Sequence, residues 1–153
     1  MAEAEVAELL AEQRTVTLAT IGPDGLPHLA AMWFAPDGPA GIDLLIWTYG
    51  TSQKVRNLER DPRASVMAEA GVAYSELRGV CLDCEVALVR DPEEVLRIGR
   101  LLWARNLAGD GASPLGAEVE AGLRAQAGKR VGVRLRSVRI RAWDHRKLVA
   151  PKR

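Results

Sequence analysis

Residues 47–58 read Trp47-Thr48-Tyr49-Gly50-Thr51-Ser52-Gln53-Lys54-Val55-Arg56-Asn57-Leu58, an apolar strand that breaks at a glycine and continues as a polar helix. Backbone N–H groups at a helix N-terminus lack partners within the helix and lie at the positive end of its dipole, so they attract anions. Thr51 or Ser52 can cap the helix while offering a hydroxyl group, and Lys54 adds a positive charge. The segment therefore predicts a cradle for a phosphate group.

Length and composition limit the kinds of protein that the chain can be. It has 153 residues, 48% of them hydrophobic, and a formal net charge of +1. This length fits one domain spanning residues 1–153, and the near-neutral charge argues against a nucleic-acid partner. No apolar run approaches the roughly 20 residues of a transmembrane helix, so no membrane partner is expected. The acidic start, residues 1–5, lacks the basic region of a signal peptide, so we expect a cytoplasmic protein.

Hydrophobic periodicity and turn residues divide the rest of the chain into short elements. Apolar residues at helical spacing predict a helix at about 3–13, and the run Gly22-Pro23-Asp24-Gly25 predicts a tight turn between two strands. The cradle helix should end at Arg60, because the residue before Pro62 is disfavoured in the α region. The predicted strands are 14–21, 26–34, 42–49, 63–70, 77–90 and 130–143, with a second turn at 35–41.

The second half of the chain carries a helical insertion at about 91–127. Asp91 as cap and Pro92 at the first helical position form a strong helix start. A glycine-rich loop follows at 109–116, and a short helix at 117–127. The alternation of the last strand changes phase, which predicts a β-bulge near Arg136 and Ser137. The pattern indicates a mainly β fold, a six- to seven-stranded antiparallel barrel or sandwich formed by residues 14–90 and 129–143 with flanking helices.

The chain has two cysteines, Cys81 and Cys84, within an alternating strand. Residues three apart on a strand point to opposite faces, which opposes a shared metal or a redox pair. With only two histidines in the chain, no metal site is predicted, and we expect two reduced cysteines.

The order of these motifs resembles the pyridoxamine 5′-phosphate oxidase-like split barrels, and among them the flavin/deazaflavin oxidoreductases. The resemblance covers residues 6 to 145. It is carried by Val16 to Thr20, Asp24-Gly25-x-Pro27-His28, Met32-Trp33-Phe34, Ile46-Trp47-Thr48, Ser52-x-Lys54-x-x-Asn57-Leu58, Asp61-Pro62-Arg63 and the strand from Arg78 to Asp91. It implies a split β-barrel of the FMN-binding type. Such proteins are normally homodimers, with the cofactor in grooves at the subunit interface.

The resemblance also implies cofactor-binding residues. Ser52 and Lys54 would contact the cofactor phosphate. Trp47 and Thr48 would line the ring pocket with Met32 and Trp33 nearby, and Arg56 and Asn57 would extend the cradle. No catalytic side chain is implied, because the cofactor ring carries the electrons and the protein supplies position and electrostatics.

The implied function is a deazaflavin (coenzyme F420)-dependent oxidoreductase that reduces a small organic acceptor by hydride transfer. The alternatives are an FMN-binding oxidase or reductase and a non-enzymatic flavin- or haem-binding protein. The chain lacks the carboxy-terminal Arg/Trp signature of true pyridoxamine phosphate oxidases, which argues against vitamin B6 oxidation. F420 differs from FMN by a lactyl-oligoglutamate tail, and two groups of arginines could receive its carboxylates: Arg56, Arg60 and Arg63, or Arg134, Arg136, Arg139 and Arg141. The acceptor pocket is expected from the loops near 71–77 and 109–116.

Overall fold

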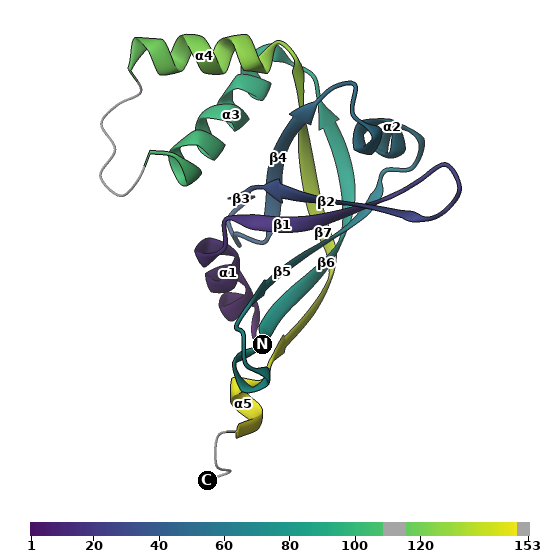
Figure 1. The fold of residues 1–153 in the computed structure, drawn as a ribbon, viewed down its shortest axis with the longest axis vertical. Helices are drawn as coiled ribbons and strands as arrows, with labels where there is room; N and C mark the ends of the chain where they lie inside the picture. Colours follow the sequence, from purple (N-terminus) through teal and green to yellow (C-terminus); the bar gives the residue numbers. More distant parts are fainter. Residues whose placement is uncertain (109–115, 150–153) are drawn as a thin grey trace.

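The computed structural model describes residues 1–108 and 116–149, and its framework is one seven-stranded antiparallel sheet (Figure 1). The strands are β1 Thr15–Ile21, β2 Pro27–Trp33, β3 Ala35–Asp37, β4 Asp43–Tyr49, β5 Arg63–Ala70, β6 Arg78–Val89 and β7 Arg130–Asp144. Their order in the sheet is β2-β1-β5-β6-β7-β4-β3. This arrangement confirms the prediction of a mainly β, split-barrel fold.

Among the described residues, five α-helices and one 3-10 turn flank the sheet (Figure 1). They are α1 Glu3–Glu12, α2 Gln53–Arg60, η1 Tyr74–Glu76, α3 Pro92–Asn106, α4 Ala117–Ala127 and α5 Arg146–Val149. The predicted start of α3 is confirmed, since the Asp91 side chain accepts a hydrogen bond from the backbone N–H of Glu94 at 2.9 Å. In the described part of the chain, every helix is too short or too polar to cross a membrane. The expected acceptor loop at 109–116 lies, except for Gly116, outside the described residues.

The longest pairing in the sheet joins β6 to β7. β5 pairs with the first part of β6, from Arg78 to Glu85, whereas β4 pairs with the first part of β7, from Arg130 to Leu135. Because β6 and β7 are antiparallel, these two stretches lie at opposite ends of the shared ladder. The sheet is therefore divided into two halves that meet along β6 and β7.

A β-bulge on β7 marks the boundary between the two halves. Asp83 pairs with Arg139 and the next residue, Cys84, pairs with Ser137, so Val138 is the extra residue. A bulge increases the local twist and bends its strand, which helps the sheet to curl. The bulge predicted near Arg136 and Ser137 is confirmed, one residue further along the chain.

The second predicted turn is shorter than expected. Ala35 to Asp37 were predicted to belong to a turn, but they form β3 and pair with β4 from Asp43 to Leu45. Ala35 is buried, which favours extended backbone here over an exposed turn. Pro36 has no N–H group to donate, and β3 is an edge strand, where proline is tolerated.

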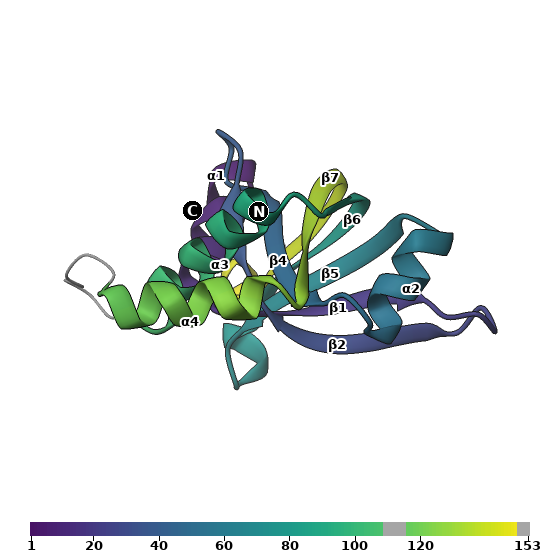
Figure 2. The ribbon, with the colours of Figure 1, turned by 90° about the horizontal axis from the view of Figure 1, so that it is seen from above.

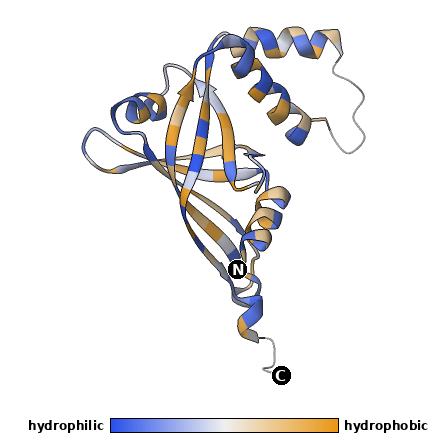
Figure 3. Cartoon of the chain, turned by 180° about the vertical axis from the view of Figure 1, so that it is seen from behind, coloured by the Kyte–Doolittle hydropathy of each residue, from blue (hydrophilic) through white to orange (hydrophobic). Residues whose placement is uncertain are grey.

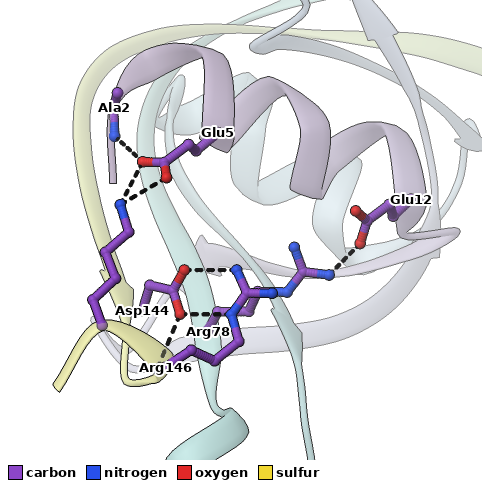
Figure 4. Close-up of polar contacts among 7 residues, drawn as sticks. Ala2, Glu5, Glu12, Arg78, Asp144 and Arg146 are labelled. Atoms are coloured by element: carbon purple, nitrogen blue, oxygen red, sulfur yellow. Dashed lines mark hydrogen bonds and ion pairs between the residues drawn. The ribbon is translucent and has the colours of Figure 1, made fainter. Parts of the chain in front are cut away.

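The main core lies between the curled sheet and α1 (Figure 3). Hydrophobic and hydrophilic residues alternate along the strands, as expected where one face of a sheet is buried. α1 contributes Val6, Leu9 and Leu10 to this core. Two ion pairs also connect α1 to the rest of the chain (Figure 4). Glu12 pairs with Arg78 on β6, and Glu5 pairs with Lys147 on α5.

A second core joins α3 to the opposite face of β4. It includes Leu45, Ile98 and Leu102, with the ring of Trp47 packed against it, and Trp47 also packs against a third cluster, in which α4 meets α3. Gly99 on α3 makes this contact possible, because a Cβ at that position would lie only 2.5 Å from Cζ3 of Trp47. The helix can therefore approach the sheet this closely only without a side chain at residue 99.

We expect Gly99→Ala to lower the free energy of unfolding by about 1–3 kcal/mol, because the new methyl group overlaps the rigid Trp47 ring. Urea denaturation followed by circular dichroism measures the change. Gly122→Ala is the matched control on α4. A Cβ there meets nothing within 4 Å, so this variant should gain about 0.5–1 kcal/mol from helix propensity. Equal stabilisation by both substitutions would contradict the proposed packing at Gly99.

Candidate functional site

The helix α2 lies across β1 and directly follows β4 (Figure 2). The turn between them is held by two backbone hydrogen bonds, from Gly50 N–H to Lys129 at 3.1 Å and from Ser52 N–H to Tyr49 at 3.0 Å. The helix ends at Arg60, as predicted from the Asp61-Pro62 sequence. Its N-terminal end is thus fixed to the ends of two paired strands.

The N-terminal end of α2 presents hydrogen-bond donors that lack acceptors. Ser52 occupies the N-cap position, but its side chain makes no capping hydrogen bond, and its buried Oγ has no partner. Within residues 1–108 and 116–149, no group accepts a hydrogen bond from the backbone N–H of Gln53 or Lys54. The side-chain cap expected from Thr51 or Ser52 is therefore absent, and the donors are available to a ligand. Buried polar groups normally have partners, so an orphaned hydroxyl here indicates a binding position.

Lys54 brings its charge to the same end of the helix. Its Nζ donates to Oγ1 of Thr48, at 3.1 Å, and Thr48 is only 3% exposed. Burial lowers the pKa of the Lys54 ammonium group, because the charged form loses hydration without gaining a described carboxylate partner. A bound anion would compensate for that loss. Ser52, Lys54 and the first-turn N–H groups together have the donor chemistry that a phosphate group requires, and their role in binding one stays a prediction.

Asn57 and Arg56 lie on different sides of α2. Asn57 is fully buried; its Nδ2 donates to Oγ1 of Thr20 at 3.0 Å and its Oδ1 accepts from Nε2 of Gln53 at 2.9 Å. Both parts of the Asn57 amide are therefore engaged within the chain. Arg56 is exposed and has no side-chain partner in the described part of the chain.

Trp47 and Thr48, predicted to line one pocket, point to opposite faces of β4. Thr48 contacts Lys54, whereas Trp47 packs beneath α3 with the guanidinium of Arg130 over its ring, 4.7 Å from the ring centroid. Adjacent strand residues alternate between faces, so one of the two has to point away from the cradle. Sequence reasoning missed Arg130, which also stacks on Tyr49 at 4.2 Å. Only the pairing of Tyr49 with Arg130 reveals this contact.

Met32 and Trp33 lie away from the cradle on the edge strand β2. Thr20, beneath α2, pairs with His28, whereas Trp33 pairs with Thr15 at the other end of β1. At the rise of a β-strand, this separation is about 16 Å. Met32 packs against the main core, and the Trp33 side chain is 46% exposed. Within one chain the structure does not bring these two residues to Lys54.

A groove of about 510 Å³ lies on the outer face of the sheet, beyond the C-terminal end of α2. Its lining includes Thr20, Arg63, Ser65, Asp83 and Arg139. The volume falls in the range of small-molecule pockets. None of the residues predicted to bind the phosphate or the ring lines it, but Arg63 and Arg139, each in one of the two arginine groups considered for the F420 tail, do. The register of the sheet brings its strands together.

The two cysteines have different surroundings, as their spacing predicted. Cys84 is buried and 2% exposed, whereas Cys81 is half-buried, with its Sγ 3.4 Å from a guanidinium nitrogen of Arg141. Among the described residues, no group of three or more histidine, cysteine or acidic side chains could hold a metal ion.

Nearly the whole chain matches one known protein family. Residues 2–144 match the family model described as pyridoxamine 5′-phosphate oxidase. The chain belongs to the pyridoxamine 5′-phosphate oxidase family. No protein of curated function matches the chain.

Solved structures agree with this family and differ in the functions that their names state. A conserved hypothetical protein from Mycobacterium tuberculosis is 43% identical, with a TM-score of 0.87 over 100% of this chain and 91% of that chain. An F420 reductase is 26% identical, with a TM-score of 0.66 over 88% of this chain and 94% of that chain. A haem storage protein from Vibrio cholerae, 20% identical, shares the fold with a TM-score of 0.67 over 90% of this chain and 91% of that chain.

Burial raises the pKa of the Cys84 thiol to about 11, so at pH 8 it remains protonated and unreactive. In a Cys81→Ala variant, we expect iodoacetamide at pH 8 to leave the folded protein unmodified and to label Cys84 after unfolding in urea. Intact-mass spectrometry counts the added groups. Rapid labelling of the folded variant would contradict the burial of Cys84.

Proposed function

We propose that this member of the pyridoxamine 5′-phosphate oxidase family is a coenzyme F420-dependent oxidoreductase that reduces a small organic acceptor. The observation that carries the proposal is the set of donors without acceptors at the N-terminal end of α2, namely the buried Oγ of Ser52 and the backbone N–H groups of Gln53 and Lys54. The Lys54 ammonium group, which donates to the Thr48 hydroxyl and has no described carboxylate partner, adds a positive charge beside them. These donors suit the phosphate that F420 and FMN share.

In this proposal the chain binds and orients the cofactor, and a bound deazaflavin would supply the hydride. Ser52 and the helix N–H groups would hold the phosphate, which fixes the cofactor at one end. Thr48 accepts a hydrogen bond from Lys54 and so directs the ammonium group. A carboxylate pair or a nucleophilic triad is not required for this chemistry.

The arrangement of arginines favours F420 over FMN. On β7, Arg134 pairs with Glu94, Arg136 with Glu85, and Arg139 and Arg141 with Asp83. On or next to α2, Arg63 pairs with Asp61. By contrast, Arg56 and Arg60 form no ion pair with a described carboxylate, and they follow Lys54 along the same helix. If the oligoglutamate tail of F420 runs from the phosphate site along α2, its carboxylates can therefore pair with Arg56 and Arg60.

The neighbours are consistent with this choice and keep two alternatives open to experiment. The F420 reductase shares 26% identity over most of both chains, which supports the deazaflavin. An FMN-dependent oxidase or reductase would use the same cradle for the same phosphate. The likeness to the haem storage protein is one of fold, and a fold does not fix a function.

We propose further that the protein is a homodimer that closes the cofactor site at its interface. The outer face of the sheet carries exposed apolar side chains, among them Leu29, which is 63% exposed, Trp33, and Met67, which is 37% exposed. Register places them on the same side of β2, β1 and β5, because Leu29 pairs with Ala19 and Met67 with Thr17. Several large exposed apolar side chains on one face of a sheet are typical of a protein–protein contact. Trp33, distant from the cradle of its own chain, would contribute to this interface.

Fluorescence titration of the purified protein with F420, and separately with FMN, tests the cofactor. We expect saturable F420 binding and a loss of about 10- to 100-fold in affinity for Lys54→Ala, because a charge-assisted contact to phosphate is removed. Lys147→Ala is the matched control. This lysine lies on α5, far from α2 in the sequence, and it forms an ion pair with Glu5 on α1. It should bind F420 as tightly as the wild type.

The same titration separates the alternatives. If FMN binds more tightly than F420, the proposed cofactor is FMN instead of F420. If neither cofactor binds, the proposed enzyme is overturned. Reduced cofactor that is oxidised faster on addition of an acceptor, such as a quinone, identifies an enzyme. A carrier would bind the cofactor without that acceleration.

Light scattering after size-exclusion chromatography tests the proposed dimer. We expect Leu29→Glu to shift the protein from dimer to monomer, because two carboxylates would be buried in the symmetric contact. Leu148→Glu on α5 is the control, since Leu148 is at least as exposed as Leu29 but lies outside the sheet face. A wild-type monomer, or an unchanged dimer for Leu29→Glu, would rule out this face.

A further inference from the structure

The interior side of α2 carries a polar contact that the phosphate site itself does not use. Asn57 is fully buried, and its amide links Gln53 on its own helix to Thr20 on β1. Thr20 is also buried, 2% exposed, and its strand pairs with β2 on one side and β5 on the other. The helix is thus bonded to a strand in the interior of the sheet rather than to a mobile loop.

These contacts exclude Asn57 as a direct ligand of a cofactor in this arrangement. Its Nδ2 donates to Thr20 and its Oδ1 accepts from Gln53, and no atom of its side chain reaches the surface. A buried amide costs free energy unless it is hydrogen-bonded, so a ligand could recruit Asn57 only by breaking a satisfied pair. The amide must serve the position of the helix.

The shortness of α2 explains why such a contact is needed. The helix has eight residues, and only Val55, Asn57 and Leu58 are buried. Isolated helices of this length are marginal in water, and apolar contacts are not directional. A hydrogen bond from Asn57 to Thr20 fixes both the rotation of the helix and its height above β1. Arg60 adds a second attachment to the same strand by donating to the carbonyl oxygen of Ile21.

We propose that Thr20 and Asn57 are positioning residues that hold the N-terminal turn of α2 where its donors converge on a phosphate, and so determine the preference for phosphorylated cofactors. This inference rests on the proposed phosphate site. Ser52 and Lys54 lie one turn before Asn57 on the same helix, so a small rotation about its axis moves both. Sites with several donors lose affinity when their supporting contacts loosen by fractions of an ångström to about 1 Å.

The test compares a phosphorylated cofactor with its phosphate-free analogue on the full-length chain. The pairs are FMN with riboflavin, and F420 with the deazaflavin that lacks the phosphate and tail. We expect Thr20→Val to weaken binding of the phosphorylated member about tenfold while the phosphate-free member changes by less than about twofold. Thr20→Ser keeps the hydroxyl group and should restore the preference.

Ser137→Ala is the control. It also removes a hydrogen-bonded hydroxyl group from the sheet, since Ser137 Oγ donates to the carbonyl oxygen of Ile42 at 2.8 Å, but this hydrogen bond does not involve α2. It should leave the preference unchanged. Thermal melting of every variant identifies any that fails to fold, and Asn57→Ala then probes the same hydrogen bond from the helix side. That variant removes the amide group that donates to Thr20, and it should lose the preference in the same way.

Each outcome decides between the hypotheses. A wild type that binds both members of each pair equally would overturn the phosphate site, and the positioning role with it. A wild type that prefers the phosphorylated member, combined with a folded Thr20→Val that keeps this preference or weakens both members equally, would overturn the positioning role alone. Selective loss in Thr20→Val with rescue in Thr20→Ser would establish it.

Discussion

The pairing of β6 with β7 is the constraint on which the position of every other element depends. The two strands remain hydrogen-bonded from Arg78 opposite Asp144 to Val89 opposite Gly132, interrupted only at the bulge. The other edge of β6 pairs with β5, and the other edge of β7 pairs with β4. These two pairings lie at opposite ends of the β6–β7 ladder. The bulged residue, Val138, lies where one half of the sheet gives way to the other. The end of β4, and therefore the start of α2, is placed by this ladder rather than by local sequence.

The fold was largely predictable because it rests on local patterns. Proline and glycine mark the hairpin before Leu26, and Asp91 with Pro92 marks the start of α3. These signals act over a few residues and need no knowledge of neighbouring strands. β3 escaped prediction for the opposite reason. Its three residues resemble a turn, and they are extended only because β4 offers an edge to pair with.

The candidate site was predictable only along α2. Ser52 and Lys54 share one helical turn, so their proximity follows from the helix itself. Trp47 and Thr48 are neighbours in sequence but alternate on the strand, and the chain does not reveal which face α3 will cover. The absence of a side chain at Gly99 lets the Trp47 ring pack beneath α3, which determines the face that α3 covers. This contact joins residues that are far apart in sequence. Sequence patterns carry no signal for such a long-range choice.

The electrostatics of α2 follow from the way its charged groups are distributed between the helix and the strands. Four β7 arginines, Arg134, Arg136, Arg139 and Arg141, face carboxylates on described neighbours. Such surface pairs contribute little to stability, although they do neutralise one another. Lys54 has only the Thr48 hydroxyl, and burial lowers its pKa. The resulting free-energy cost persists in the folded protein unless an anion binds beside it. An unpaired, half-buried ammonium group next to orphaned donors is therefore better explained by a ligand than by the stability of the fold.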